Sequence, residues 1–356
     1  MLQILQHSLY FSGNESIFYQ IHMDKKERQQ KILQMLEQDR IVQVSDILRI
    51  VPVERTTIYR DFQELEDTHR VEKIGRWSYR KKVDPTVYLQ TPFFQRPKKT
   101  YNFDFLDGYT PNQSRFFSEK QSQILHKGIE MLDINTDFYT NNKRLLETTL
   151  IDLSFASSYL EGNTYDYLDT EILVKYNEIA KEKSADDTQM ILNHKKCIEY
   201  LVYYKKELLY TKQTFFEIHT LLWERLLPKE NLWIIRNKIV EIWASMYLPF
   251  DNRYQLEEQF EIFLEKLNSI QNPFEQSLFI LVFIPYFQIF LDINKRTSRM
   301  ISNLPLLKKN LPLISLLAVE KRDYITAILA VYELNNVSLL ADIFVSNYLL
   351  NMKRYI

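Results

Sequence analysis

Glycine is scarce in this chain, with five glycines among 356 residues. Glycine supplies the left-handed backbone that tight turns and the phosphate loops of doubly wound sheets require. Its scarcity therefore argues against such sheets, against barrels and against turn-rich sandwiches. The abundant leucine, isoleucine, lysine, glutamate and glutamine residues suit helices better. We expect a mainly α-helical protein, long enough for two or three domains.

The remaining bulk features place the chain in a broad class. The only cysteine, Cys197, excludes an internal disulfide framework and a cysteine-based zinc site. The net charge is −1, so any affinity for nucleic acid must come from a local patch. The first ten residues do not resemble a signal peptide, and the most apolar run, 278–287, is too short to span a bilayer. We expect a cytoplasmic protein with no membrane association.

Three helical patterns and an alternating segment predict a winged helix-turn-helix over residues 24–82. In the third helix the apolar residues recur at i, i+4 and i+7, the spacing of a single buried face. Ser45 is the expected N-cap of the second helix. The segment 70–82 alternates around Gly75 and predicts a two-stranded wing. The expected helices are 25–38, with Ile32, Leu33 and Leu36 inward, 45–50, with Ile47 and Leu48 inward, and 54–67, with Ile58, Phe62 and Leu65 inward.

The third helix has a polar face at its N-terminal end, and the wing holds six Lys or Arg against one Glu. The stretch 53–65 resembles the recognition segment of DeoR-like bacterial repressors. Such a helix presents side chains to the major groove of DNA, while basic wing residues engage phosphates. A winged helix can instead serve as a protein–protein or dimerisation module, and a basic wing can be merely solvated. The candidate DNA-binding residues are Arg55, Thr56, Thr57, Tyr59, Arg60 and Arg76.

Residues 83–145 are predicted to connect the two modules. The first part holds four prolines without periodicity, so we expect an extended strap that packs against the second module. Helical structure is expected to begin over 117–132.

The second module, 146–356, has its chemistry near residue 294, where one helical pattern breaks and another begins. Lys295, Arg296 and Arg299 stand in the opening turns of the new helix. Cations there oppose the helix dipole, and with the free N–H groups they suit a bound phosphate. The arginines are three apart and share a face. They can alternatively pair with nearby carboxylates alone.

The segment 288–299, QIFLDINKRTSR, resembles the signature of the Fic (filamentation induced by cAMP) family, HPFx(D/E)GN(G/K)RxxR. The stretch SSYLEGN also resembles the family's inhibitory motif, through Ser157, Glu161 and Gly162. The resemblance implies an all-helical domain with an inhibitory helix at 153–164 and a β-hairpin flap at 235–250 that docks the target. Fic enzymes transfer AMP from ATP, or another phosphate-containing group, to a hydroxyl on a protein.

The resemblance also implies roles for single residues. Asp292 would hold Mg²⁺, Phe290 would anchor the loop, and the ATP phosphates would bind to Asn294, Lys295, Arg296 and Arg299. Glu161 would pair with Arg299 and so misplace the phosphates, which is the family's autoinhibition. The sequence NKR at 294–296 also occurs in the kinase-like Doc branch.

Two departures from the signature bear on catalysis. Gln288 stands where the family has its catalytic histidine, and an amide cannot act as a general base near neutral pH. Ile293 replaces a glycine, and a β-branched residue resists the positive φ that this glycine allows. Ile289 replaces a proline, which is a milder change. His194 and His219 are possible catalytic residues but are better explained as structural ones.

Three functions remain open at this stage. The favoured one is a regulator that binds nucleotide and controls DNA binding, with weak or no transfer of AMP. The second is an active adenylyltransferase or phosphotransferase held off by Glu161. The third is a scaffold that binds no nucleotide. Expected partners are DNA, a nucleotide with Mg²⁺ and, for an active transferase, a protein target, and a homodimer is the default assembly.

Overall fold

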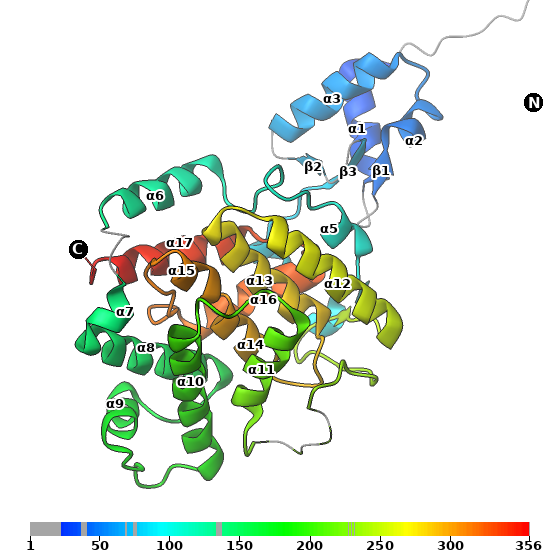
Figure 1. The fold of residues 1–356 in the computed structure, drawn as a ribbon. Coiled ribbons are helices and arrows are strands. Elements are labelled where there is room, and N and C mark those ends of the chain that lie inside the picture. The colour runs from blue at the N-terminus through cyan, green and yellow to red at the C-terminus, as the bar shows by residue number, and fades with distance from the viewer. Residues whose placement is uncertain are drawn as a thin grey trace, which may run out of the picture. The chain divides into compact units, whose positions relative to one another are not determined.

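A computed structural model describes residues 23–36, 41–67, 70–73, 77–132, 137–226, 228, 230 and 232–355. The chain divides into two compact units, 1–83 and 84–356 (Figure 1). Each unit has its own buried apolar cluster. The fold is mainly helical, with an N-terminal helix-turn-helix, as the sequence predicts.

Within its described residues, the first unit contains three helices and a small antiparallel sheet in the order β1-β3-β2 (Figure 1). β2 and β3 form the predicted wing, with Glu72 opposite Arg80. The third strand, β1, was not expected; its two residues pair with the start of β3. The elements are α1 (Lys25–Met35), β1 (Val42–Gln43), α2 (Val44–Leu48), α3 (Arg55–Asp67), β2 (Val71–Lys73) and β3 (Ser78–Lys81).

The start of α2 differs from the prediction. Ser45 lies inside the helix, and Gln43 is the N-cap residue. The Asp46 carboxylate accepts a hydrogen bond from the Gln43 N–H at 3.0 Å, which completes a capping box. Val44 donates its N–H to the Trp77 carbonyl at 3.1 Å. Because this bond extends the β1–β3 pairing, the strand runs straight into the helix and leaves no room for a cap at Ser45.

The core of the first unit confirms the predicted inward face of α3. Ile58, Phe62 and Leu65 are all buried, and the Phe62 ring stacks on Tyr79 of β3 with centroids 3.9 Å apart. α1 contributes Ile32, and α2 contributes Ile47. The helices and the wing therefore share one core, which is how a unit of this size gains enough buried apolar surface to fold.

Two isoleucines near α2 give a matched test of this core. Ile47 is 0% exposed, whereas Ile50, three residues later, is 47% exposed. We expect Ile47→Ala to destabilise the first unit by about 2–5 kcal/mol, because it leaves a cavity. Ile50→Ala should cost less than about 1 kcal/mol. Denaturant unfolding of both variants measures the difference, and equal losses would contradict the assigned core.

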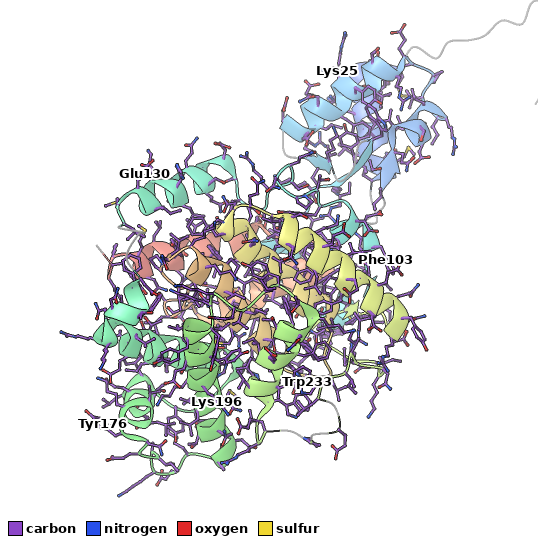
Figure 2. All side chains as sticks on the ribbon, in the orientation of Figure 1. Lys25, Phe103, Glu130, Tyr176, Lys196 and Trp233 are labelled. Carbon is purple, nitrogen blue, oxygen red and sulfur yellow. The ribbon has the colours of Figure 1, made fainter. Side chains whose placement is uncertain are left out.

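The second unit is built almost entirely from helices. Its elements are α4 (Pro85–Tyr88), η1 (Phe93–Gln95), β4 (Lys99–Thr100), α5 (Phe103–Asp107), α6 (Glu119–Glu130), α7 (Phe138–Asn141), α8 (Lys143–Glu161), α9 (Tyr167–Tyr176), α10 (Ala185–Tyr203), α11 (Lys212–Trp223), β5 (Tyr247–Leu248), α12 (Arg253–Ser269), α13 (Pro273–Phe287), α14 (Asn294–Ile301), α15 (Leu304–Lys308), α16 (Lys321–Leu334) and α17 (Ser338–Met352). Tyr176 and Trp233 lie at its surface (Figure 2).

The centre of this unit is α13, whose residues are buried from Phe274 onward (Figure 1). α12, α14, α15 and α16 pack around it. A helix that is apolar on all sides needs such a complete cover. No helix among the described residues is long and apolar enough to cross a membrane. The apolar run noted in the sequence is therefore the core of the unit.

The first part of the connector is not the extended strap that the sequence predicted. It forms the short elements α4, η1, β4 and α5, because its prolines and asparagines begin new turns, as Pro85 does at the start of α4. It does pack on the helices. Arg96 donates to the Glu333 carboxylate of α16 at 2.8 Å, and Tyr88 donates to the same carboxylate at 3.0 Å.

The expected β-hairpin at 235–250 is wrong. This segment contains one strand, β5, which pairs in parallel with β4 of the connector. Ile235 and Tyr247 are buried, whereas Ile239 and Trp243 are exposed, so positions that would share one face of a regular strand have opposite surroundings. An alternation of apolar and polar residues does not identify the partner strand, and here that partner lies more than 140 residues earlier.

Candidate functional site

The loop between α13 and α14 depends on two residues with left-handed backbone. Gln288 ends α13 with φ +50°, and Ile293 precedes α14 with φ +67°. The Asn294 side chain closes the loop between them. Its Oδ1 accepts from the Phe290 N–H at 2.9 Å, and its Nδ2 donates to the Phe290 carbonyl at 2.8 Å. α14 therefore begins directly at the loop, where its first N–H groups have no intrahelical partner.

The conformation of Ile293 differs from our expectation. The sequence predicted that a β-branched residue would resist the positive φ of the family's glycine, yet Ile293 adopts it. A left-handed non-glycine residue costs roughly 1–2 kcal/mol. The Ile293 side chain is buried, and full burial of such a side chain contributes roughly 1.5–3 kcal/mol. Burial therefore offsets the strain, and the turn keeps its shape.

The Gln288 side chain is a structural connection between three helices. Its Nε2 donates to the Pro285 carbonyl at 2.7 Å and to the Tyr332 hydroxyl of α16 at 3.3 Å. Its Oε1 accepts from Asn294 Nδ2 at 3.1 Å. Both hydrogens on Asn294 Nδ2 are used in bonds inside the loop. A phosphate would therefore be bound by the backbone N–H groups and the basic residues of α14 and not by this amide.

Three cations occupy the opening turns of α14. Arg296 and Arg299 are buried, and Lys295 is partly exposed. Arg296 forms an ion pair with Asp292 at 4.0 Å and also lies near Glu161, and its buried Nε has no hydrogen-bond partner among the described residues. Burial lowers the pKa of Arg296, although the neighbouring carboxylates oppose this shift. A buried guanidinium with an unused donor is suited to an anion.

Glu161 lies against these cations, as the inhibitory motif implies. It is the last residue of α8, followed by the C-cap Gly162 at φ +94°. One carboxylate oxygen accepts from Arg299 at 2.8 Å, and the other lies 3.2 Å from Lys295. Burial opposes ionisation, but the charges of Arg299, Lys295 and Arg296 outweigh it and lower the pKa of Glu161 to about 2. Glu161 is therefore ionised at neutral pH.

Arg299 is held by residues of two other helices, α8 and α16. Besides Glu161, it donates to the Ser157 hydroxyl and the Ser157 carbonyl of α8, each at 3.0 Å. Its remaining nitrogen donates to the Tyr324 hydroxyl of α16 at 3.1 Å. Ser157 and Glu161 of the inhibitory motif therefore contact the same guanidinium, and Gly162 lets α8 end beside it.

His194, weighed above as a catalytic candidate, is a structural residue. It is buried in α10, with Nε2 2.9 Å from the Ser157 hydroxyl and Nδ1 2.8 Å from the Met190 carbonyl. Because Arg299 donates to Ser157, the Ser157 hydroxyl donates onward to Nε2. Nδ1 then carries the proton. Burial, reinforced by the nearby Arg296 and Arg299, lowers the pKa of His194 to about 3, so the ring is neutral.

His219 is also structural. Its ring stacks on Phe290 with centroids 3.8 Å apart, and its Nε2 donates to the Asp292 carbonyl at 3.1 Å. Burial lowers the pKa of His219 to about 3. Phe290 is buried, as expected of the residue that anchors the loop. The imidazole thus supports the loop from the side of α11.

Arg236 is a residue of the site that sequence reasoning missed. It is buried and donates to carbonyls on both sides of it. On one side are the Gln288 and Phe287 carbonyls at the end of α13, and on the other is the Phe250 carbonyl, at 2.7 Å. Arginine satisfies carbonyls at a helix C-terminus in this way. A lone arginine in an apolar stretch gives no sequence signal of this role.

In the first unit, the candidate DNA-binding residues have different surroundings. Arg55 donates to the Tyr59 hydroxyl at 2.9 Å, and its guanidinium lies 5.2 Å from the Trp77 ring centroid of the wing. This cation–π contact orients the Arg55 side chain. Arg60 is exposed, and Arg76 lies outside the described residues.

The two threonines among the candidate DNA-binding residues lie in the first turn of α3. Thr56 is exposed and donates to the Glu54 carboxylate at 3.2 Å, and Thr57 is half-buried. In the wing, Arg80 pairs with Glu72, which neutralises one of the basic charges there.

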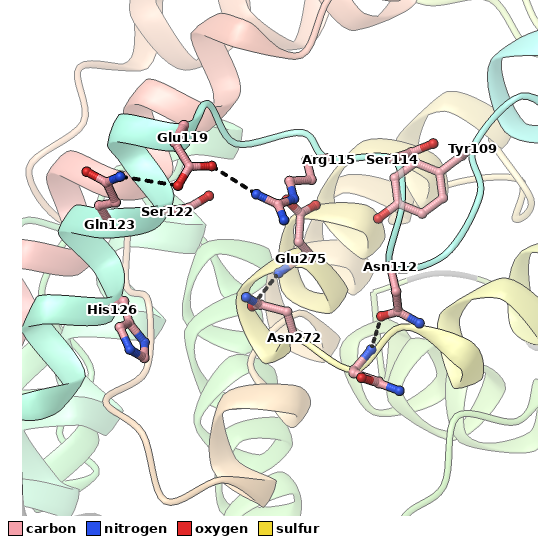
Figure 3. A pocket seen from close by; sticks show the side chains of 11 residues that line it. Tyr109, Asn112, Ser114, Arg115, Glu119, Ser122, Gln123, His126, Asn272 and Glu275 are labelled. Atoms are coloured by element: carbon pink, nitrogen blue, oxygen red, sulfur yellow. Dashed lines mark hydrogen bonds and ion pairs between the residues drawn. The ribbon is translucent and has the colours of Figure 1, made fainter.

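A separate polar cavity of about 450 Å³ lies beside the N-terminus of α13 (Figure 3). Its polar groups largely bond one another. Glu119 accepts from Arg115 at 3.0 Å and from Gln123 at 3.2 Å, and the Asn112 side chain accepts from the Gln271 N–H at 2.9 Å. This internal pairing leaves little polar capacity for a ligand, so we assign none.

The strained position gives a prediction about stability. At most sites Ala is more stabilising than Gly, but at φ +67° the order should reverse. Both Ile293→Ala and Ile293→Gly lose the buried side chain and should be less stable than the parent. We expect Ile293→Gly to be the more stable of the two by about 1 kcal/mol. Chemical denaturation measures this, and a more stable alanine variant would contradict the assigned backbone.

Comparisons with known proteins agree with this geometry. A family model described as the Fic/DOC family matches residues 209–306, and a model of the DeoR-like helix-turn-helix domain matches residues 28–75. The inhibitory motif lies outside both ranges. A search of curated proteins finds no match.

Solved structures of Fic proteins share a fold with this chain at low identity. A Fic-domain-containing signalling protein from Bacteroides thetaiotaomicron has a TM-score of 0.53 and 16% identity, covering 66% of this chain and 95% of its own. A Fic family protein from Desulfovibrio desulfuricans has a TM-score of 0.56 and 15% identity, covering 69% and 76%. A Fic-1 fragment from C. elegans has a TM-score of 0.53 and 15% identity, covering 66% and 72%. The chain thus joins a DeoR-like helix-turn-helix domain to a domain of the Fic/DOC family.

Proposed function

We propose that this protein is a regulator whose Fic domain binds an ATP-type nucleotide with Mg²⁺ and controls DNA binding by the helix-turn-helix domain. In this proposal the transfer of AMP is weak or absent. The observation that carries it is the cluster of Lys295, Arg296 and Arg299 around one displaceable carboxylate, Glu161. A triphosphate supplies the negative charge that this cluster needs when Glu161 withdraws.

The described residues suit a metal that arrives with its nucleotide. No group of three His, Cys, Asp or Glu side chains among them is placed to hold a metal ion. Asp292 is mostly exposed beside the buried cations, and one carboxylate with phosphate and water oxygens is an ordinary Mg²⁺ environment. Bound there, Mg²⁺ would neutralise phosphate charge. Asp292 would orient it, and Arg296 would take a phosphate oxygen on its free donor.

The surroundings of Gln288 support weak transfer. Its amide is committed to Pro285, Tyr332 and Asn294 and has no basic site. Burial holds the pKa of Tyr332 well above its usual value, so this phenol stays protonated. Both nitrogens of His194 are engaged with Ser157 and Met190. None of these groups is free to accept the proton of an attacking hydroxyl.

The second candidate is an active protein adenylyltransferase or phosphotransferase. The contact between Glu161 and Arg299 favours it, because a domain with no transfer activity gains little from inhibition. The segment 235–250 also exposes Trp243 and Ile239, which suits a surface that docks a protein.

Nucleotide binding is the first test. We expect Glu161→Gly to bind ATP with Mg²⁺ at least about tenfold more tightly than the parent, because the competing carboxylate is gone. Arg296→Ala in the same background should abolish this gain. Calorimetric titration measures both affinities. Absence of binding in Glu161→Gly would refute the proposed nucleotide site and favour a scaffold.

The same variant separates the regulator from the enzyme. Labelled ATP incubated with Glu161→Gly should leave the protein unlabelled if transfer is absent. Covalent label on this protein or on an added lysate protein, lost in Arg296→Ala, would establish the enzyme instead.

DNA binding has its own test. We expect the full chain to select a duplex from a random-sequence library, and affinity for that duplex should fall as salt rises. Arg60→Ala and Arg55→Ala should each weaken binding by about tenfold or more. Lys26→Ala removes an exposed charge from α1 and serves as the control. No selected duplex, or equal binding by all three variants, would refute the DNA-binding role of α3.

A further inference from the structure

A second cavity, of about 610 Å³, lies at the end of α13 remote from the Fic motif. Gln276 lines it from the first turns of α13, twelve residues before Gln288. At 1.5 Å per residue this places the cavity roughly 18 Å from the motif. Its walls come from the ends of α10, α12 and α15 and the start of α13. The lining residues are Lys205, Lys206, Tyr210, Ile270, Gln271, Gln276, Pro305, Leu307, Lys308, Lys309 and Asn310.

The charge of this lining is unusual for the molecule. Among the residues that the structure describes, four lysines line the cavity and no carboxylate does, although the whole chain has a net charge of −1. Lys205 is buried. Its ammonium group forms an ion pair with Asp137 at 2.9 Å and donates a hydrogen bond to the Asn310 side chain at 3.2 Å. Concave surfaces of one charge concentrate the local field.

The positive charges of the other three lysines have fewer carboxylates close to them. No ion pair within the described residues involves Lys206, Lys308 or Lys309. Lys308 is half-buried, and burial lowers its pKa, with Glu207 as the one opposing charge. Within the described part of the chain, two carboxylates, Asp137 and Glu207, therefore face four ammonium groups, which leaves an excess of positive charge at the cavity.

The C-terminus of α15 does not by itself account for this excess. Lys308 is in the last turn of α15 and Lys309 is its C-cap residue, where cations are favourable. A helix C-terminus carries at most about half an elementary charge, and α15 has five residues. The dipole of so short a helix cannot balance the two lysines at its end together with Lys206.

The remaining wall is apolar and ordered. Ile270, Pro305 and Leu307 line it beside the Tyr210 ring. The Gln276 side chain is buried and fixed, because it donates to the Leu267 carbonyl at 3.1 Å and accepts from the Tyr210 hydroxyl at 3.4 Å. Ile270, Pro305 and Leu307 are themselves buried, so the cavity offers mobile point charges on one side and the partly exposed, fixed Tyr210 ring on the other.

We propose that this cavity is a second anion site, which binds a phosphorylated small organic molecule. Lysines pair with phosphate as flexible point charges, so they suit a ligand with several negative charges. The apolar wall suits the organic part of the ligand. The volume lies in the range of small-molecule pockets and is far too small for a macromolecule. This inference is independent of the function proposed for the Fic motif.

The test uses the full chain carrying Arg296→Ala, so that the Fic motif is impaired. ADP and inorganic pyrophosphate are titrated calorimetrically in magnesium-free buffer with chelator. We expect both to bind, ADP more tightly because it also covers the apolar wall. Adding Lys206→Gln and Lys309→Gln should weaken ADP binding by about tenfold. Both lysines are exposed, so these substitutions should leave thermal unfolding unchanged.

Lys143→Gln with Lys181→Gln is the matched control, since it removes two exposed charges from the same unit. ADP binding that persists in the control and weakens in the Lys206, Lys309 variant supports the site. Absence of ADP binding, or equal affinities in the two variants, overturns it. Pyrophosphate bound as tightly as ADP overturns the role of the apolar wall. None of these outcomes depends on whether the Fic motif binds nucleotide.

Discussion

The need to satisfy one buried guanidinium organises the second unit. Arg299 cannot lose its proton in a protein, so each of its donors requires an acceptor inside the fold. Ser157 and Glu161 of α8 and Tyr324 of α16 supply them. Two helices far apart in the sequence, α8 and α16, are thereby fixed around α14. The charge that would bind phosphate is also the charge that holds the unit together while no anion is present.

Local patterns in the sequence predicted most of what is local in the structure. The apolar spacing of Ile58, Phe62 and Leu65 gave the inward face of α3, and the order of two short motifs placed Glu161 near Arg299. Such local patterns do not predict which distant segments pair with one another. The connector's partnership with the segment 235–250 and the bonds from Arg236 depend on tertiary contacts that no periodicity encodes.

Gln288 and Ile293 show where inference from residue type fails. Chemistry alone shows that an amide is no general base, but it does not show that Gln288 bonds to Tyr332 and Asn294. Backbone preference predicted that Ile293 would distort the turn, whereas burial of its side chain compensates. In both cases the surrounding packing determines the conformation of the residue, and neighbouring positions in the sequence do not predict that packing.

Arg236 has a consequence for slow motions of the molecule. Its guanidinium bonds to carbonyls of the segment 235–250 and of the α13 terminus together. Local opening of that segment would leave the helix carbonyls without their donor, so the two regions form one cooperative opening unit. Their amide hydrogens should then exchange with solvent at a common rate, although one region is a surface segment and the other ends the most deeply buried helix.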